Sequence, residues 1–234
     1  MKAAIILLSG GLDSATALYY AKAQGYKTHA LIFDYGQRHK KEIIQAKKIA
    51  QRAGCDTRVV KISLPWQGSS LLDKKMRLPQ NRRIIPPEIP STYVPARNII
   101  FLSFAASYAE VAGAQAIFIG ANAIDYSGYP DCRPDFFEAF QKVIRQGMKA
   151  GVEGRKIKIM APLLHKTKAQ IIRMGLKLKV PYELTWSCYQ GGAKPCGKCD
   201  SCVLREKGFQ EVLKGPKSKG QNVKSCYNFL RLTI

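Results

Sequence analysis

The sequence lacks several features that would place the protein in other classes. None of its 234 residues belongs to an apolar run of about 18 that could span a membrane, and no signal-peptide pattern precedes the first apolar segment. It has no Gly-x-x-x-x-Gly-Lys-Ser/Thr run, which excludes a Walker-type phosphate loop, and no internal repeat. These absences predict a cytoplasmic globular protein, and its hydrophobic fraction of 46% supplies an ordinary core.

Acidic residues are scarce. Asp and Glu number 16 against 38 Lys and Arg, which gives a formal net charge of +22. Such a balance is compatible with nucleic-acid binding, because clustered cations release counterions from phosphates. The lysines are spread along the chain, however, and form no stripe interleaved with aromatic residues. We therefore interpret the charge as a basic surface around a site for anionic substrates, with RNA contact as the open alternative.

The most informative segment is the run Ile5-Ile6-Leu7-Leu8-Ser9-Gly10-Gly11-Leu12-Asp13-Ser14-Ala15-Thr16. An apolar strand ends in Ser-Gly-Gly, and a helix begins at once. Two adjacent glycines permit a tight turn and a close approach of the backbone to a ligand. The free N–H groups and positive dipole end of the helix face that turn, and Ser9, Ser14 and Thr16 add hydroxyl donors. The run predicts a pyrophosphate site, and a tight turn without a ligand is the alternative.

Strands and helices alternate over residues 1–181, which is typical of a doubly wound parallel sheet of the Rossmann-like class. The five expected strands are Ala3–Leu8, Lys27–Phe33, Arg58–Ile62, Ala116–Gly120 and Ile157–Ala161. The expected helices are Ser14–Gln24, Lys40–Ala53, Asn98–Ala112, Arg133–Arg145 and Lys168–Lys179. The helix over 98–112 is apolar nearly all round, so we expect it to be buried. Residues 64–95 show no sustained period and predict a long loop.

Four of the seven cysteines form a C-x7-C-x2-C-x2-C cluster: Cys188, Cys196, Cys199 and Cys202. Four thiolates supply a closed tetrahedral shell for Zn2+, and a reducing compartment disfavours disulfides. An iron–sulfur cluster is the rival, because thiolates suit both. We favour structural zinc, since no redox step is otherwise indicated. The expected division is a nucleotide-binding domain at 1–181, a metal-binding region at 182–207 and a basic extension at 208–234.

Three further strings lie beside the expected strands and the apolar helix: FDYGQRH at 33–39, STYVPARN at 91–98 and SGYPDCR at 127–133. Arg97 places a cation where the helix dipole favours an anion, which indicates a functional role. Together with SGGLDS and the cysteine spacing, these strings resemble the QueC/ExsB family of preQ0 synthases, a branch of the PP-loop ATP pyrophosphatases. The resemblance covers residues 1–207.

The resemblance implies an adenine nucleotide alpha-hydrolase-like fold and an ATP-dependent ligase. Such a ligase converts 7-carboxy-7-deazaguanine and ammonia to the nitrile 7-cyano-7-deazaguanine (preQ0) for queuosine or archaeosine. AMP transfer would activate first the carboxylate and then the amide, with Mg2+ on the phosphates. A homodimer is the family expectation.

The resemblance also implies roles for individual residues. Catalytic roles fall to Asp13, Ser14 and Arg97. Nucleotide contacts are expected from Leu8, Ser9, Gly10, Gly11, Leu12, Asp13, Ser14, Ala15, Thr16, Ala17, Leu18, Asp34 and Arg38. Contacts to the deazaguanine are expected from Arg97, Asp125, Tyr126, Tyr129, Asp131 and Arg133. Lys166 and Lys168 follow the fifth strand and are placed to reach phosphates.

Three rival functions stay open at this point. A tRNA sulfurtransferase of the same superfamily would suit the basic charge but needs a reactive thiol, and Cys132 beside Arg133 is the candidate. A glutamine-dependent amidotransferase needs a glutaminase domain or an N-terminal nucleophilic cysteine, whereas the second residue is Lys2. The third rival is a zinc-stabilised nucleotide- or RNA-binding module without catalysis.

Overall fold

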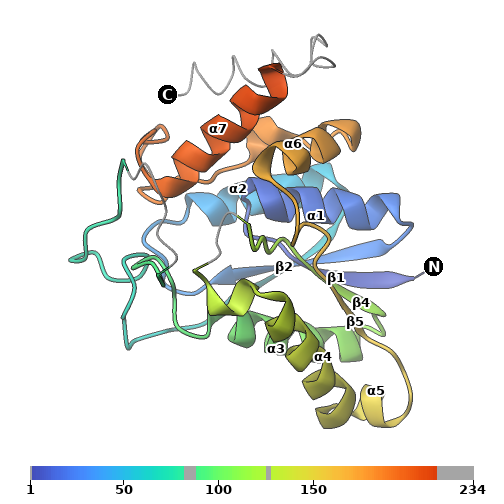
Figure 1. The fold of residues 1–234 in the computed structure, drawn as a ribbon. Helices are drawn as coiled ribbons and strands as arrows, with labels where there is room; N and C mark the ends of the chain where they lie inside the picture. Colours follow the sequence, from blue (N-terminus) through green and yellow to red (C-terminus); the bar gives the residue numbers. More distant parts are fainter. Residues whose placement is uncertain (1, 82–87, 125–127, 215–234) are drawn as a thin grey trace.

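The computed structural model describes residues 2–81, 88–124 and 128–214 (Figure 1). Its centre is a five-stranded sheet in the order β3-β2-β1-β4-β5, and every neighbouring pair of strands is parallel. The strands are β1 (Ala3–Leu7), β2 (Lys27–Asp34), β3 (Asp56–Lys61), β4 (Ala116–Ile119) and β5 (Lys158–Met160). Strands β1 and β4 are buried and almost wholly apolar, because helices cover both faces of the sheet.

The helices lie in two layers (Figure 1). Helices α1, α2, α6 and α7 share one core with the upper face of the sheet, and α3 and α4 share a second core with the lower face. The helical segments are α1 (Leu12–Ala23), α2 (Lys41–Arg52), α3 (Arg97–Val111), α4 (Pro134–Gly147), α5 (Lys149–Val152), α6 (Lys168–Lys177), α7 (Asp200–Lys214) and the 3-10 turns η1 (Pro130–Cys132) and η2 (Tyr182–Leu184). The predicted doubly wound parallel sheet is confirmed.

Helix α7 is an element that the sequence pattern does not predict, because Cys, Gly and Lys obscure its period. It packs on α6 so closely that a Cβ on Gly208 would lie 2.5 Å from Lys168 Cγ. Phe209 is fully buried, and its ring lies 5.7 Å from that of Tyr182. The helix runs across the expected boundary at residue 207, and the division into regions stays a prediction.

Helix α3 differs from the expected burial. Leu102 and Ala105 are fully buried, whereas Phe104 is 42% exposed and Val111 is 85% exposed. The expectation of a helix buried all round is therefore wrong: within the described part of the chain, nothing covers its outer apolar face. The long loop predicted over 64–95 is confirmed for its described residues, 64–81 and 88–95, which contain no helix or strand beyond one isolated bridge between Gln80 and Cys199.

None of the helices in the described ranges combines the length and the hydropathy that a membrane span requires.

Candidate active site and metal centre

A cavity opens at the carboxyl ends of β1, β2 and β4, the edge where parallel sheets of this kind bind ligands. Its walls come from the turn between β1 and α1, the first turns of α2 and α3, and the segment before the cysteine cluster. The charged side chains in its lining are Asp13, Arg38, Glu42, Arg97, Lys168 and Arg205. Cations outnumber acids in this lining, so the cavity suits an anionic ligand.

The turn after β1 presents backbone N–H groups to this cavity. Helix α1 follows Gly11, and no described side chain caps its N-terminus, so its first N–H groups are available to an anion. The hydroxyls of Ser9 and Ser14 lie 3.0 Å apart, and the Ser9 N–H donates to the Ser14 hydroxyl at 3.2 Å. Trp186 donates its N–H to the Gly10 carbonyl at 2.9 Å and so holds the turn from outside.

Gly10 is required by this geometry for two separate reasons. Its φ of +84° is a backbone conformation that residues with a Cβ rarely adopt. A Cβ at this position would also lie 2.3 Å from the Glu42 carbonyl oxygen at the start of α2. The close approach of the turn to α2 therefore depends on glycine.

Gly10→Ala should destabilise the protein by about 2–4 kcal/mol, because backbone strain and a clash with α2 add together. Gly25→Ala is the matched control, since Gly25 has a φ of +80° but nothing within 4 Å of its Cβ position. That control should lose only about 1 kcal/mol. Urea unfolding of the two variants measures the difference, and equal losses would contradict the close packing of the turn on α2.

Asp13 and Lys168 form an ion pair beside this turn. Lys168 Nζ lies 2.8 Å from each carboxylate oxygen of Asp13, and the side chains of Lys168 and Asp13 are 10% and 18% exposed. Lys168 is the first residue of α6, where Thr167 and Gln170 form a capping box. Lys168 lines the cavity, as expected of a phosphate-reaching lysine, whereas Lys166 does not.

Arg97 brings a second cation into the cavity from the start of α3. Ala96, which precedes the helix, has a left-handed φ of +57°, and the Arg97 guanidinium donates to the Tyr35 hydroxyl at 3.5 Å. Burial disfavours the charge of Arg97, but Tyr35, Tyr129 and Asp131 outweigh it and raise its pKa. A charged, planar set of donors in this position is suited to a carboxylate or a phosphate.

Asp131 is paired with Asn98 of α3. Its carboxylate accepts the Asn98 N–H at 3.1 Å, and its carbonyl accepts from Asn98 Nδ2 at 2.9 Å. Asp131 thereby satisfies the first turn of α3. Neither Asp131 nor the exposed Arg133 lines the cavity, whereas Tyr129 does. Of the other expected contacts to the deazaguanine, Asp125 and Tyr126 lie outside the described residues.

The expected run of nucleotide contacts divides into two sets. The residues that line the cavity are Leu8, Ser9, Gly11, Leu12, Asp13 and Ser14. The residues that do not line it are Gly10, Ala15, Thr16, Ala17 and Leu18. Thr16 shows why: its buried hydroxyl donates to the Leu12 carbonyl at 2.8 Å and lies 2.9 Å from the Tyr182 hydroxyl. One helical turn past the N-terminus, the side chains of α1 face the core.

Two further expected contacts bind protein groups. The Asp34 carboxylate accepts from Lys40 Nζ at 2.9 Å and does not line the cavity. Arg38 lines the cavity, but its guanidinium donates to three backbone carbonyls of the long loop, the shortest at 2.7 Å to Lys74. Arg38 therefore fixes the loop beside the cavity.

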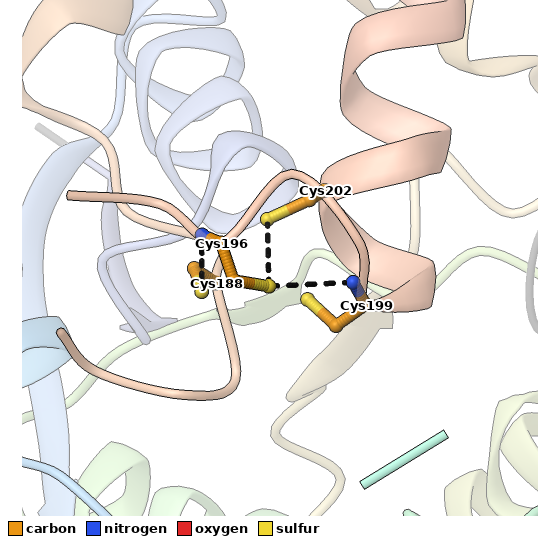
Figure 2. A group of neighbouring side chains, drawn as sticks. All are labelled: Cys188, Cys196, Cys199 and Cys202. Carbon is orange, nitrogen blue, oxygen red and sulfur yellow. Dashed lines mark hydrogen bonds between the residues drawn. The ribbon is translucent and has the colours of Figure 1, made fainter. Parts of the chain in front are cut away.

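The cysteine cluster forms a compact group at the start of α7 (Figure 2). The four thiol sulfurs lie within 4.8 Å of one another, and Cys188 and Cys199 are almost fully buried. The N–H groups of Cys196 and Cys199 donate to cluster sulfurs, each at 3.3 Å. Four convergent sulfurs with backbone donors fit a tetrahedral metal shell with no open position.

The segment before the cluster connects it to the turn between β1 and α1, residues 9–11, which is named the phosphate turn below. The Trp186 backbone binds Gly10, as described, and its indole N–H donates to the Cys188 carbonyl at 2.9 Å. Lys41 Nζ lies 4.0 Å from the centre of the Trp186 ring and donates to the Gly192 carbonyl at 2.6 Å. The loop that carries the cysteine cluster, the start of α2 and the phosphate turn thus form one contact network.

The comparisons with known proteins identify the family of the chain. A family model described as "Queuosine biosynthesis protein QueC" matches residues 3–213. The chain belongs to the QueC family. It is 56% identical over 212 residues to a 7-cyano-7-deazaguanine synthase of Thermoplasma acidophilum, with 90% of this chain and 89% of the relative covered. The corresponding enzyme of Trichodesmium erythraeum is 55% identical over 213 residues, with 89% and 96% covered.

A solved structure shares the fold of this QueC chain. It is described as a 4-thiouridine synthetase–RNA complex with bound ATP, and the alignment has a TM-score of 0.50 at 18% identity. It covers 99% of this chain and 52% of that one. At this identity the likeness shows the common fold.

Cys132 of this QueC chain is poorly suited to sulfur transfer. The thiol is 6% exposed, and burial, reinforced by Asp131, raises its pKa to about 12. Its sulfur accepts a hydrogen bond from Asn98 Nδ2 at 3.4 Å. A neutral, buried thiol is a weak nucleophile. We therefore interpret Cys132 as a residue that packs beside the first turn of α3.

Glu42 and Trp186 are members of the site that the sequence patterns do not reveal. Glu42 lines the cavity, and burial raises its pKa to about 7 against the opposing effect of Arg97. The available signal is that Glu42 is the one acid in the lysine-rich helix expected over 40–53. Trp186 lies two residues before the first cysteine of the cluster, and no periodicity in the sequence indicates its contact with Gly10.

Proposed function

We propose that the protein is an ATP-dependent carbon–nitrogen ligase that makes 7-cyano-7-deazaguanine from 7-carboxy-7-deazaguanine and ammonia. A carboxylate resists attack by ammonia, so transfer of AMP first converts it to an acyl-adenylate, with pyrophosphate as the other product. Ammonia displaces AMP and gives the amide. A second ATP activates the amide oxygen, and loss of AMP leaves the nitrile. The observation that carries the proposal is a phosphate turn and Arg97 in one cavity of a chain of the QueC family.

The described residues support specific roles in this reaction. The N–H groups that follow Gly11 and the hydroxyls of Ser9 and Ser14 bind the pyrophosphate of ATP. Lys168, held by Asp13, adds an ammonium hydrogen-bond donor at the same place. Arg97 binds the substrate carboxylate and stabilises the negative charge that develops on the attacked oxygen. Tyr129 lines the same cavity, and in this proposal it contacts the deazaguanine ring.

The metals have separate roles in the proposal. The four cysteines hold Zn2+, which closes the loop before α7 and supplies no open position for chemistry. Mg2+ enters with ATP as part of the substrate, bound to its phosphates. Asp13 pairs with Lys168 through both of its carboxylate oxygens and so holds this cation beside the phosphates.

We also propose a cytoplasmic homodimer. The six cysteines in the described ranges are free of disulfides, which suits a reducing compartment. The outer face of α3 leaves Ile99 and Phe104 more than 40% exposed. An apolar face of this kind is typical of a protein–protein contact, and a second copy of the chain is the partner that we propose.

Mass spectrometry of a reaction with the protein, 7-carboxy-7-deazaguanine, ATP, Mg2+ and ammonium tests the function. We expect the nitrile together with AMP and pyrophosphate. Cys132→Ala should change the rate by less than about threefold, since its thiol takes no part. ATP consumption only with tRNA and a sulfur donor, abolished in Cys132→Ala, would establish the sulfurtransferase function in its place. Tight nucleotide or tRNA binding without turnover would indicate the binding module.

A further inference from the structure

Glu42 is an acidic residue in a cavity whose overall charge favours an anionic ligand. Of the two acids in the lining, Asp13 is neutralised by Lys168. Across residues 2–81, 88–124 and 128–214, Glu42 has neither a cation within ion-pair distance nor a side-chain hydrogen bond. Glu42 is half-buried in the wall of the cavity, and an acid without a protein partner there is available to a ligand that carries a positive charge.

The position of Glu42 is fixed beside the reacting groups. It lies in the first turn of α2, and its backbone carbonyl is the atom against which Gly10 packs. Glu42 lines the same cavity as Arg97 and as Tyr35, the hydrogen-bond partner of Arg97. Glu42 therefore shares this cavity with the phosphate turn and with the guanidinium proposed to bind the substrate carboxylate.

The chemistry of the reactants identifies what an acid does here. ATP, the deazaguanine acid, AMP and pyrophosphate are all anions, and an unpaired carboxylate would repel each of them. The nitrogen substrate is different, because in neutral water it is almost wholly the ammonium cation. Ammonium has no lone pair until it loses a proton, so the site needs a group that both attracts the cation and accepts the proton.

We propose that Glu42 is the carboxylate that binds the ammonium ion and takes its proton as nitrogen attacks the acyl-adenylate. This inference rests on the proposed function. One N–H proton passes to Glu42, the nitrogen lone pair forms the C–N bond, and the C–O bond to phosphate breaks so that AMP leaves with the electron pair. The protonated amide nitrogen then loses a second proton, and solvent takes both. No electrons enter or leave.

Glu42→Gln tests this role, because it keeps the shape of the side chain and removes the charge. The value of kcat/KM for ammonium should fall about 100-fold or more, with a raised KM for ammonium. Pyrophosphate release that depends on the deazaguanine acid, which precedes nitrogen attack, should stay within about threefold of normal. Hydroxylamine is neutral at pH 7, so it should form the hydroxamate in the variant at close to the normal rate.

Two further variants complete the design. Glu42→Asp keeps the carboxylate and should recover part of the ammonium activity. Glu138→Gln removes an exposed acid of α4 and should match the unaltered protein. Equal losses with ammonium and hydroxylamine, loss of pyrophosphate release, or a changed Mg2+ requirement in Glu42→Gln would overturn the ammonium role. Absence of acid-dependent pyrophosphate release in the unaltered protein would instead overturn the proposed function, and this inference with it.

Discussion

Asp13→Ala should abolish ATP-dependent turnover and lower the stability of the protein by about 3 kcal/mol. Without its partner, Lys168 is left charged and only 10% exposed beside the phosphate turn, and removal of one member of a buried pair leaves an uncompensated charge. Lys168 also loses the contact that aims it at the cavity. Urea unfolding and pyrophosphate release measure the two effects separately.

The double variant Asp13→Ala/Lys168→Met separates stability from function. Methionine keeps an unbranched stem in the narrow space below Gly208 of α7 and removes the buried charge. Replacement of both members of such a pair by apolar groups is often neutral, so stability should return to within about 1 kcal/mol of the original. Turnover should stay absent, because the cation at the phosphate turn is gone. Recovery of turnover in the double variant would show that the pair is only structural.

Cys199→Ser should remove the bound metal and, with it, the affinity for ATP. Cys199 is fully buried in the cluster, and a structural zinc site contributes on the order of 10 kcal/mol to the folding of its segment. The loop it closes carries Trp186, whose N–H binds the Gly10 carbonyl at 2.9 Å. Disorder of this loop should release the phosphate turn from that contact. Elemental analysis and ATP titration by calorimetry provide the measurements.

Cys55→Ser is the matched control for the loss of a buried thiol. Its sulfur donates to the Thr28 carbonyl at 3.1 Å, far along the chain from the cluster, and serine can keep that bond. The control should retain both metal and ATP binding. Unchanged ATP affinity in metal-free Cys199→Ser would contradict this prediction, because it would show that ATP binding does not depend on the metal. Visible absorbance of the purified protein would identify an iron–sulfur cluster in place of zinc.

Local patterns explain why the fold was predictable. The strand β1 and the glycine turn after it follow from a short apolar run and Ser-Gly-Gly, which act over a few residues. The four cysteines come together in space, and their close spacing is visible in the sequence itself. The exposure of the outer face of α3 was not predictable. An apolar residue such as Val111 indicates burial, but the sequence does not show which surface would cover it.

The residues of the site were less predictable, because their roles depend on long-range contacts. Asp131 has the chemistry of a ligand group, yet Asn98 occupies its carboxylate from 33 positions away. Arg38 has the chemistry of a phosphate-binding group, yet it holds the backbone of the long loop. The pairing of Asp13 with Lys168 joins positions that are 155 residues apart. Composition indicates which groups can bind a ligand, and only packing determines which remain free to do so.

The contact between Trp186 and Gly10 has a consequence for the order in which the protein matures on the ribosome. The phosphate turn is among the first segments to be translated, and domains start to fold from the N-terminal side during synthesis. Two of its partners, Lys168 and Trp186, are translated late. A nascent chain released before residue 168 therefore contains the complete motif near residue 10 but lacks both of these contacts. Prematurely terminated products of this gene should not compete for cellular ATP.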